Sequence, residues 1–151
     1  MTPTLLEPSA IHLGLRATDR FDAVAQAGKA LLDIGAVDEP YLDAMLERER
    51  TLSTFLGDGF ALPHGTDDSR AHVRRPAIAV LQFPDGVGWD GANVHVAIAV
   101  ASATDEHVRI LAQVANVITD PDRADQLRGA TDPQVVLELL MPSTEEQVTT
   151  Q

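Results

Sequence analysis

The sequence of 151 residues contains no cysteine, and only 4% of its residues are aromatic. The missing cysteine excludes disulfide bonds, thiolate metal ligands and a thiol nucleophile, so any cysteine chemistry belongs to another protein. The shortage of aromatic residues leaves Ala, Val, Leu and Ile to build the core. A chain of this length fits one compact domain, which buries about 68–70% of the surface that its unfolded form exposes.

Long apolar runs and positive charges are also scarce. The longest apolar stretch, Val96–Ala101, is far shorter than the roughly 20 residues that cross a bilayer. Residues 1–9 lack the basic patch and apolar run of a signal peptide. With 11 basic against 23 acidic residues, the net charge is −12, which repels nucleic acids and anionic membranes. We therefore expect a cytoplasmic protein that neither binds nucleic acid nor inserts into a membrane.

The hydrophobic periodicity predicts both helices and strands. Helices are predicted over residues 18–34, 39–50, 104–119, 120–129 and 132–140, and strands over residues 60–62, 77–83 and 94–101. In the last strand, valine and isoleucine alternate with mainly alanine, so one face is bulky and the other is flat enough to carry a helix. The predicted fold class is α/β (α+β in some schemes), a single domain with a mixed β-sheet and helices packed on its faces. This domain covers residues 1–141, and a polar C-terminal tail follows at residues 142–151.

The residues predicted to face inward in the helix over residues 104–119 are Val108, Leu111, Ala112 and Ala115.

Gly86–Gly91 matches the spacing of a dinucleotide-binding fingerprint. Such a loop must open a helix, whereas here the chain leads directly into the strand at Val94, so a nucleotide site is not predicted. Turn chemistry at Pro84-Asp85-Gly86 and at Asp90-Gly91 is expected to join the two strands instead. The five histidines show no spacing typical of metal ligands.

His64 is the leading candidate for chemistry, because it stands between a rigid residue and a permissive one. Pro63 restricts its own φ and pushes Leu62 toward an extended conformation, while Gly65 leaves the approach to the ring open. With an unperturbed pKa of about 6.5, an imidazole is a mostly neutral nucleophile near pH 7. The alternative is a solvated histidine in a turn.

Two further residues are candidates for binding an anion. His107 falls in the first turn of a predicted helix directly after a buried strand, where free backbone N–H groups attract phosphate. The alternative for His107 is an exposed residue of that turn. Arg48 lies near the end of the helix over residues 39–50, where it either compensates the helix dipole or meets an anion. A local basic cluster, expected to be solvated or to touch an acidic partner, comprises Arg70, His72, Arg74 and Arg75.

A series of short motifs extends along nearly the whole chain. The motifs are Ile11-His12-Leu13-Gly14, Ala44-Met45-Leu46-Glu47-Arg48-Glu49, Phe55-Leu56-Gly57, Ala61-Leu62-Pro63-His64-Gly65-Thr66, Phe83-Pro84-Asp85-Gly86-Val87, Glu106-His107-Val108 and Val135-Val136-Leu137-Glu138-Leu139-Leu140. In this order they resemble the enzyme IIA domain of the bacterial phosphoenolpyruvate-dependent sugar phosphotransferase system. The resemblance is to the mannitol/fructose type and is closest to the mannitol-specific component. It implies a phosphotransferase with a phosphohistidine intermediate.

The resemblance also implies roles for individual residues. In that family the histidine of the Pro-His-Gly element, here His64, accepts a phosphoryl group from the phosphocarrier protein HPr and passes it to a cysteine of enzyme IIB. The family's second active-site histidine matches His107, and its phosphate-contacting arginine matches Arg48. The implied function is uptake and phosphorylation of a sugar or polyol, mannitol by resemblance, with no cofactor and no metal. The IIB thiol and the membrane IIC component are expected on other chains.

Two alternatives stay open at this point. A regulatory enzyme IIA of the nitrogen-related or fructose type shares the fold and the histidine but acts through protein contacts; the lead-in Ser53–Gly57 favours transport instead. Residues 88–94 differ from the more charged loop expected in the mannitol branch, which leaves the sugar and the partner open. The other alternative is a metal-dependent hydrolase that uses His64 with Asp67 or Asp68.

Overall fold

The computed structural model describes residues 6–102 and 106–140, without the side chains of residue 67 and residues 106–111. The elements are, in chain order, η1 (Pro8–Ala10), β1 (Ile11–His12), α1 (Arg20–Asp33), α2 (Pro40–Thr51), β2 (Phe55–Gly57), β3 (Phe60–Ala61), η2 (Asp67–His72), β4 (Ala77–Trp89), β5 (Ala92–Ala101), α3 (Glu106–Ile118), α4 (Pro121–Arg128) and α5 (Pro133–Leu140). Elements η1 and η2 are 3-10 helices. The tail predicted at residues 142–151 lies outside the described residues.

The strands form one five-stranded sheet in the order β1-β4-β5-β3-β2. β4 pairs antiparallel with β5, and β2 pairs antiparallel with β3. β1 runs parallel to β4, and β3 runs parallel to β5. Both pairing directions therefore occur in one sheet, which confirms the predicted mixed architecture.

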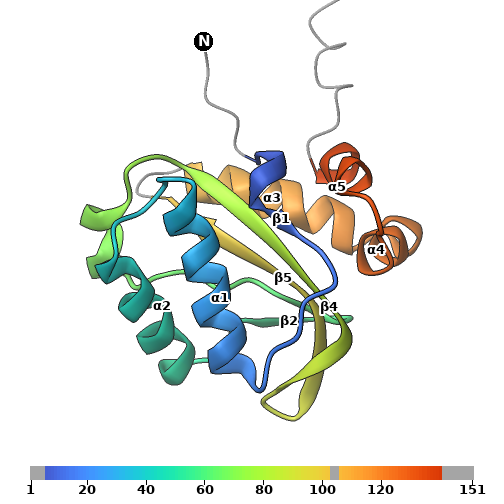
Figure 1. The fold of residues 1–151 in the computed structure, drawn as a ribbon, viewed down its shortest axis with the longest axis horizontal. Coiled ribbons are helices and arrows are strands. Elements are labelled where there is room, and N and C mark those ends of the chain that lie inside the picture. The colour runs from blue at the N-terminus through green and yellow to red at the C-terminus, as the bar shows by residue number, and fades with distance from the viewer. Residues whose placement is uncertain (1–5, 103–105, 141–151) are drawn as a thin grey trace, which may run out of the picture.

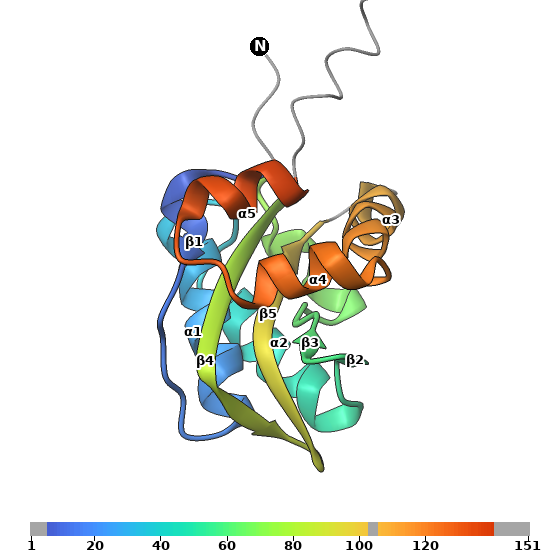
Figure 2. The ribbon, with the colours of Figure 1, turned by 90° about the vertical axis from the view of Figure 1, so that its right-hand side faces the viewer.

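Helices cover the sheet from two sides (Figures 1 and 2). α1 packs against β4 and β5, and α2 packs along α1, as Figure 1 shows. α3 and α4 contact β5, while α5 contacts β1. His95 lies on the small-residue face of β5 and shares a hollow with Asp125 and Arg128 of α4. The flat face therefore lies under α4, as the alternation along this strand predicts. None of the described helices is long and apolar enough to cross a membrane.

Local capping explains where the main helices begin. The Asp19 carboxylate accepts a hydrogen bond from the backbone N–H of Asp22 at 2.8 Å, and the Asp22 carboxylate accepts one from the backbone N–H of Thr18 at 2.9 Å. The first bond satisfies one of the N–H groups that a helix N-terminus leaves without helical partners, and the second ties the residue before the N-cap to the first turn. Asp120 caps α4 in a similar way, by accepting from two backbone N–H groups. The predicted helix starts follow from these side chains.

The hairpin between β4 and β5 corrects one prediction. Pro84-Asp85-Gly86 is not a turn, because β4 continues through it to Trp89 and only shifts its register between Gln82 and Val87. Proline has no N–H for the ladder, and Gly86 adopts a φ of +82°, so the strand absorbs the irregularity as a bulge. The turn lies at Asp90-Gly91, where both residues have positive φ.

The buried face of α3 is a second correction. Val114 and Val117 are buried, whereas Ala112 and Ala115 are exposed. A valine side chain removes more apolar area from water than an alanine does, so the larger residues determine which side of the helix faces the core. The side chains of Val108 and Leu111 lie outside the described residues. The short strands β1 and β2 were not predicted either, since two or three residues carry too little periodicity.

Candidate functional site

His64 lies where β3 leads out of the sheet. Leu62 and Pro63 continue β3 beside β5, and the Pro63 carbonyl accepts a hydrogen bond from the backbone N–H of Val100 at 2.9 Å. His64 and Val100 form an isolated parallel bridge, so the backbone of His64 is tied to the end of β5. Pro63 is buried and His64 is half-buried. The sheet therefore fixes the histidine's backbone while its ring faces a surface pocket.

The ring of His64 is oriented by a nearby carbonyl. Its Nδ1 lies 2.7 Å from the carbonyl oxygen of Leu62. A carbonyl oxygen can only accept a hydrogen bond, so Nδ1 carries the proton in the neutral ring and Nε2 carries the lone pair. A neutral histidine needs such an acceptor to keep its other nitrogen unprotonated, and in the structure this acceptor is the carbonyl of Leu62.

Tyr41 of α2 connects the helix to the histidine loop. Its hydroxyl accepts a hydrogen bond from the backbone N–H of Gly65 at 2.9 Å and donates one to the carbonyl of Val100 at 2.9 Å. The residue is only 3% exposed. Burial raises the pKa of Tyr41, against smaller lowering effects from the Gly65 N–H and the charge of Arg70. Tyr41 thus stays neutral near pH 7 and can serve as donor and acceptor at once.

Gly65 is also needed because its neighbours pack closely around it, a reason that the sequence did not indicate. A Cβ at this position would lie 2.6 Å from Cε1 of Tyr41 and in conflict with Oγ of Ser69. Ser69 is itself buried, and its hydroxyl donates to the carbonyl of Thr66. The glycine therefore permits close packing of α2 and η2 around the loop, in addition to the open approach to the ring that we expected.

Arg48 faces the same pocket from the last turn of α2. Its side chain is half-buried, and Nη1 donates to the carbonyl of Leu52 at 2.5 Å, just beyond the helix end. That bond satisfies one of the carbonyl groups left over at a helix C-terminus. Both readings of Arg48, helix-end compensation and a position for meeting an anion, are thus compatible with its placement.

The pocket has a volume of about 240 Å³. Its lining residues come from α2, the histidine loop, η2 and the end of β5: Tyr41, Arg48, Thr51, His64, Gly65, Thr66, Arg70 and Ser102. Two guanidinium groups, an imidazole and several hydroxyls meet here, although the net charge of the chain is −12. Guanidinium groups bind phosphate and carboxylate oxygens through charge-assisted hydrogen bonds. The pocket is therefore chemically suited to an oxyanion.

The structure brings together two of the three predicted site residues, His64 and Arg48. His107 is the second residue of α3, and its side chain lies outside the described residues. Sequence reasoning missed Tyr41, Thr51 and Ser102, none of which carries a local signal of function.

Arg70 was also missed as a site residue, because it was grouped with its basic neighbours. That cluster does not act as one solvated patch: Arg74 pairs with Asp38, while Arg75 donates to Glu7 and to the carbonyl of Ile34. Only the first member of the cluster, Arg70, lines the pocket.

The structure bears on two rival kinds of site. Gly86–Gly91 spans the hairpin of β4 and β5 and opens no helix, as its sequence context predicts. Among the side chains that the structure describes, which leave out Asp67 and residues 106–111, no group of three or more His, Asp or Glu is placed to hold a metal ion.

Comparisons with known proteins agree on one family. The family model described as the phosphoenolpyruvate-dependent sugar phosphotransferase system, EIIA 2, matches residues 4–142. The chain is 45% identical over 132 residues to the Multiphosphoryl transfer protein of Escherichia coli O157:H7, which covers 87% of this chain and 35% of that protein. It is 38% identical over 117 residues to the Mannitol-specific phosphotransferase enzyme IIA component of Staphylococcus aureus (strain Mu50), with 78% and 81% covered.

A solved structure shows the same fold. In the complex of enzyme IIAMTL and phosphorylated enzyme IIBMTL from Escherichia coli, the matching chain superposes with a TM-score of 0.83 at 30% identity. The match covers 90% of this chain and 98% of that one. The present chain thus has the extent of a mannitol-type IIA domain and spans about a third of the longer multiphosphoryl relative.

Proposed function

The chain belongs to the EIIA 2 family of the phosphoenolpyruvate-dependent sugar phosphotransferase system, and we propose on that basis that it carries a phosphoryl group on His64. The observation that carries the assignment is the contact between Nδ1 of His64 and the carbonyl of Leu62. It holds the ring in the tautomer whose Nε2 is the nucleophile, in a pocket lined by arginines. The mixed sheet and its helices serve to hold this loop.

The proposed reaction is a displacement at phosphorus. The lone pair of Nε2 attacks the phosphoryl group of a donor phosphohistidine, the donor's N–P bond breaks, and its electron pair stays on the donor nitrogen. The proton stays on Nδ1, hydrogen-bonded to the Leu62 carbonyl, and this bond stabilises the positive charge that develops on the ring. A second displacement then moves the phosphoryl group to a thiolate and restores the neutral histidine.

Arg48 is proposed to bind the phosphoryl oxygens, because it lines the pocket that holds His64. Phosphoryl transfer depends mainly on positioning and on compensating the charge of these oxygens. His107 is proposed to share this role, as the family resemblance implies.

The proposed donor is phospho-HPr, and the proposed acceptor is a cysteine of an enzyme IIB. The acceptor assignment draws on the solved complex of IIAMTL with phosphorylated IIBMTL, and no cysteine occurs within these 151 residues. We propose mannitol as the transported polyol, since the relative from Staphylococcus aureus is named a mannitol-specific component. The protein has 23 acidic residues, but Arg48 and Arg70 make the pocket a local cationic region.

The decisive experiment is to mix the protein with enzyme I, HPr and phosphoenolpyruvate and to map phosphorylation by intact and peptide mass at neutral or alkaline pH. One phosphoryl group on His64 is expected, and none on the His64→Ala variant, because alanine has no nucleophile. His72→Ala is the matched control, a half-buried histidine in η2 that does not line the pocket. Full acceptance by His64→Ala would overturn the assignment. Release of the phosphate to a mannitol IIB then separates transport from a regulatory role.

The same assay tests Arg48. Replacing Arg48 by alanine should slow acceptance by about a hundred- to a thousandfold, the usual effect of removing one donor that compensates developing charge. Arg50→Ala removes the same charge from the same helix, from a residue that faces solvent and pairs with Glu47, and should leave the rate nearly unchanged. Equal rates for the two variants would remove Arg48 from the site.

A further inference from the structure

We infer that Arg70 is a second phosphate-binding arginine of the His64 pocket, contributed by a different element from the one that carries Arg48. This inference rests on the proposed function, since it assigns a further catalytic residue to the same site. Arg48 comes from the end of α2, whereas Arg70 comes from η2, the short helix that follows the histidine loop. Both line the pocket together with His64.

The backbone that carries Arg70 is well anchored. Ser69, next to it, is 4% exposed. Both its backbone N–H and its hydroxyl donate to the carbonyl of Thr66, at 3.1 and 2.5 Å. The carbonyl of Arg70 in turn accepts from the backbone N–H of Val73 at 3.1 Å. Gly65 allows this turn to pack against the loop, since a Cβ there would meet Ser69. These hydrogen bonds and the packing of Ser69 against Gly65 therefore hold η2 in place.

The charge of Arg70 acts on the interior of the pocket. It lowers the pKa of the Tyr41 hydroxyl, against the larger effect of burial. That hydroxyl accepts the N–H of Gly65, the residue that follows His64. Arg70 thus exerts its field at the inner wall, beside the backbone of the phosphoryl acceptor. Its neighbours Arg74 and Arg75 point to other elements, where they pair with Asp38 and Glu7.

A transferred phosphoryl group carries negative charge on three equatorial oxygens, more than one guanidinium compensates. Two arginines on separate elements can each contact a different oxygen, with no proton moved and no bond formed by either. The N–P bond still forms at Nε2 of His64. Because one charge-assisted hydrogen bond is lost, replacing Arg70 by alanine should slow transfer about ten- to a hundredfold.

The test compares Arg70→Ala with Arg74→Ala, which removes the same charge from the same basic cluster, four residues further along the chain and outside the pocket. Each variant is phosphorylated by phospho-HPr and, separately, by phosphoramidate, a small N–P donor with no protein surface. Arg70→Ala should be slow with both donors and Arg74→Ala close to wild type with both. Arg70→Lys, which keeps the charge but loses the planar fork, should lie in between. Matching thermal unfolding of all variants shows that η2 is intact.

Two results would overturn the inference while leaving the proposed function in place. The first is an Arg70→Ala variant as fast as Arg74→Ala. The second is a defect with phospho-HPr only, which would make Arg70 a contact to an acidic partner and not to the phosphoryl group. A wild-type protein that accepts no phosphate on His64 from either donor would overturn the proposed function and this inference together.

Discussion

Arg48 and Glu49 are neighbours in the chain, yet one places its charge at a surface pocket and the other buries its charge in the interior. Arg48 is half-buried and lines the pocket of His64. Glu49 is 1% exposed and faces the other way, as residues about 100° apart on a helix do. Its carboxylate accepts hydrogen bonds from the indole of Trp89 at 2.9 Å and from the hydroxyl of Thr54 at 2.6 Å.

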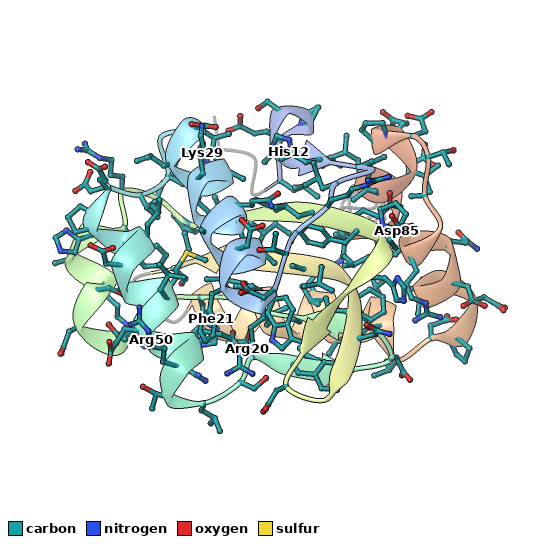
Figure 3. The ribbon with its side chains drawn as sticks, turned by 60° about the horizontal axis from the view of Figure 1, so that its bottom comes forward. His12, Arg20, Phe21, Lys29, Arg50 and Asp85 are labelled. Atoms are coloured by element: carbon teal, nitrogen blue, oxygen red, sulfur yellow. The ribbon has the colours of Figure 1, made fainter. Side chains whose placement is uncertain are left out.

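We call Glu49, Trp89, Thr54 and Arg20 the Glu49 cluster. The guanidinium of Arg20 lies 3.8 Å from the Glu49 carboxylate and 4.8 Å above the ring of Phe21, and Figure 3 shows these two labelled side chains next to each other on α1. The cluster therefore joins α1, α2, the lead-in to β2 and the hairpin of β4 and β5. A buried charge is tolerated only when it is paired and hydrogen-bonded, as here.

The comparison teaches that two consecutive residues of α2 face different surroundings, one lining the proposed site and the other stabilising the fold. Arg48 and Arg70 line a surface pocket, whereas the carboxylate of Glu49 accepts hydrogen bonds from Thr54 and Trp89 inside the protein. The two regions are connected, because the carbonyl of Thr54 accepts from the backbone N–H of Leu62 at 2.9 Å, and the carbonyl of Leu62 holds His64. Trp89 and Tyr41 are the only tryptophan and tyrosine in the sequence, so each region has its own spectroscopic probe.

The largest effect is expected from breaking the Glu49 cluster. Glu49→Ala leaves Arg20 without its buried partner and removes the acceptors of Trp89 and Thr54, which should lower the free energy of unfolding by about 3–5 kcal/mol. Denaturant unfolding followed by Trp89 fluorescence measures this loss. The control is Glu47→Ala on the exposed side of α2, with an expected change within about 0.5 kcal/mol.

Glu49→Gln provides a milder version in case the alanine variant does not fold. Glutamine keeps the shape of the side chain and one acceptor oxygen, so the free energy of unfolding of this variant should lie between those of wild type and Glu49→Ala. If Glu49→Gln and Glu47→Gln were equally stable, the cluster would not have the supporting role that distinguishes it from the pocket.

A smaller effect is expected from crowding the pocket side. Gly65→Ala places a methyl group against Tyr41 and Ser69, which should cost about 1–3 kcal/mol of stability and slow phosphoryl acceptance by shifting His64. Gly88→Ala is the matched control, because a Cβ at Gly88 meets nothing within 4 Å. Its stability should stay within about 0.5 kcal/mol of wild type. A Gly65→Ala variant with normal stability and normal transfer would contradict the need for a glycine at this position.

The smallest effect concerns the pH response of Tyr41. Burial raises its pKa in the folded protein, while the unfolded chain ionises near the ordinary value of about 10. The stability that this shift represents is fully present below about pH 10 and is lost as the pH rises through the folded pKa. Ultraviolet titration of the sole tyrosine should show a midpoint above that of the urea-unfolded protein.

Tyr41→Phe removes the ionising group and should flatten this alkaline loss of stability, measured by unfolding at successive pH values. Coinciding titration midpoints for the folded and unfolded proteins would contradict the burial effect and the hydrogen-bonded hydroxyl at the pocket.

Much of the fold was predictable because its signals are local. The start of α1 follows from Asp19 and Asp22, four residues or fewer from the groups they cap. The faces of β5 follow from alternation along one strand. The predictions failed where a distant partner decides, as in β4, which continues past Pro84 because β5 pairs with it on both sides of the bulge.

The sequence by itself determined the helices, the alternation of the central strand, the family and the choice of His64 as the candidate nucleophile, because each depends on residues close together in the chain or on the order of motifs. Only the tertiary structure decided what surrounds that histidine. The contact of Tyr41 with Val100 spans 59 residues, and that of Glu49 with Trp89 spans 40. Such contacts depend on strand order and on where α2 packs, so no local pattern encodes them. The same reason separates Arg70 from Arg74, which differ in what the fold places beside them.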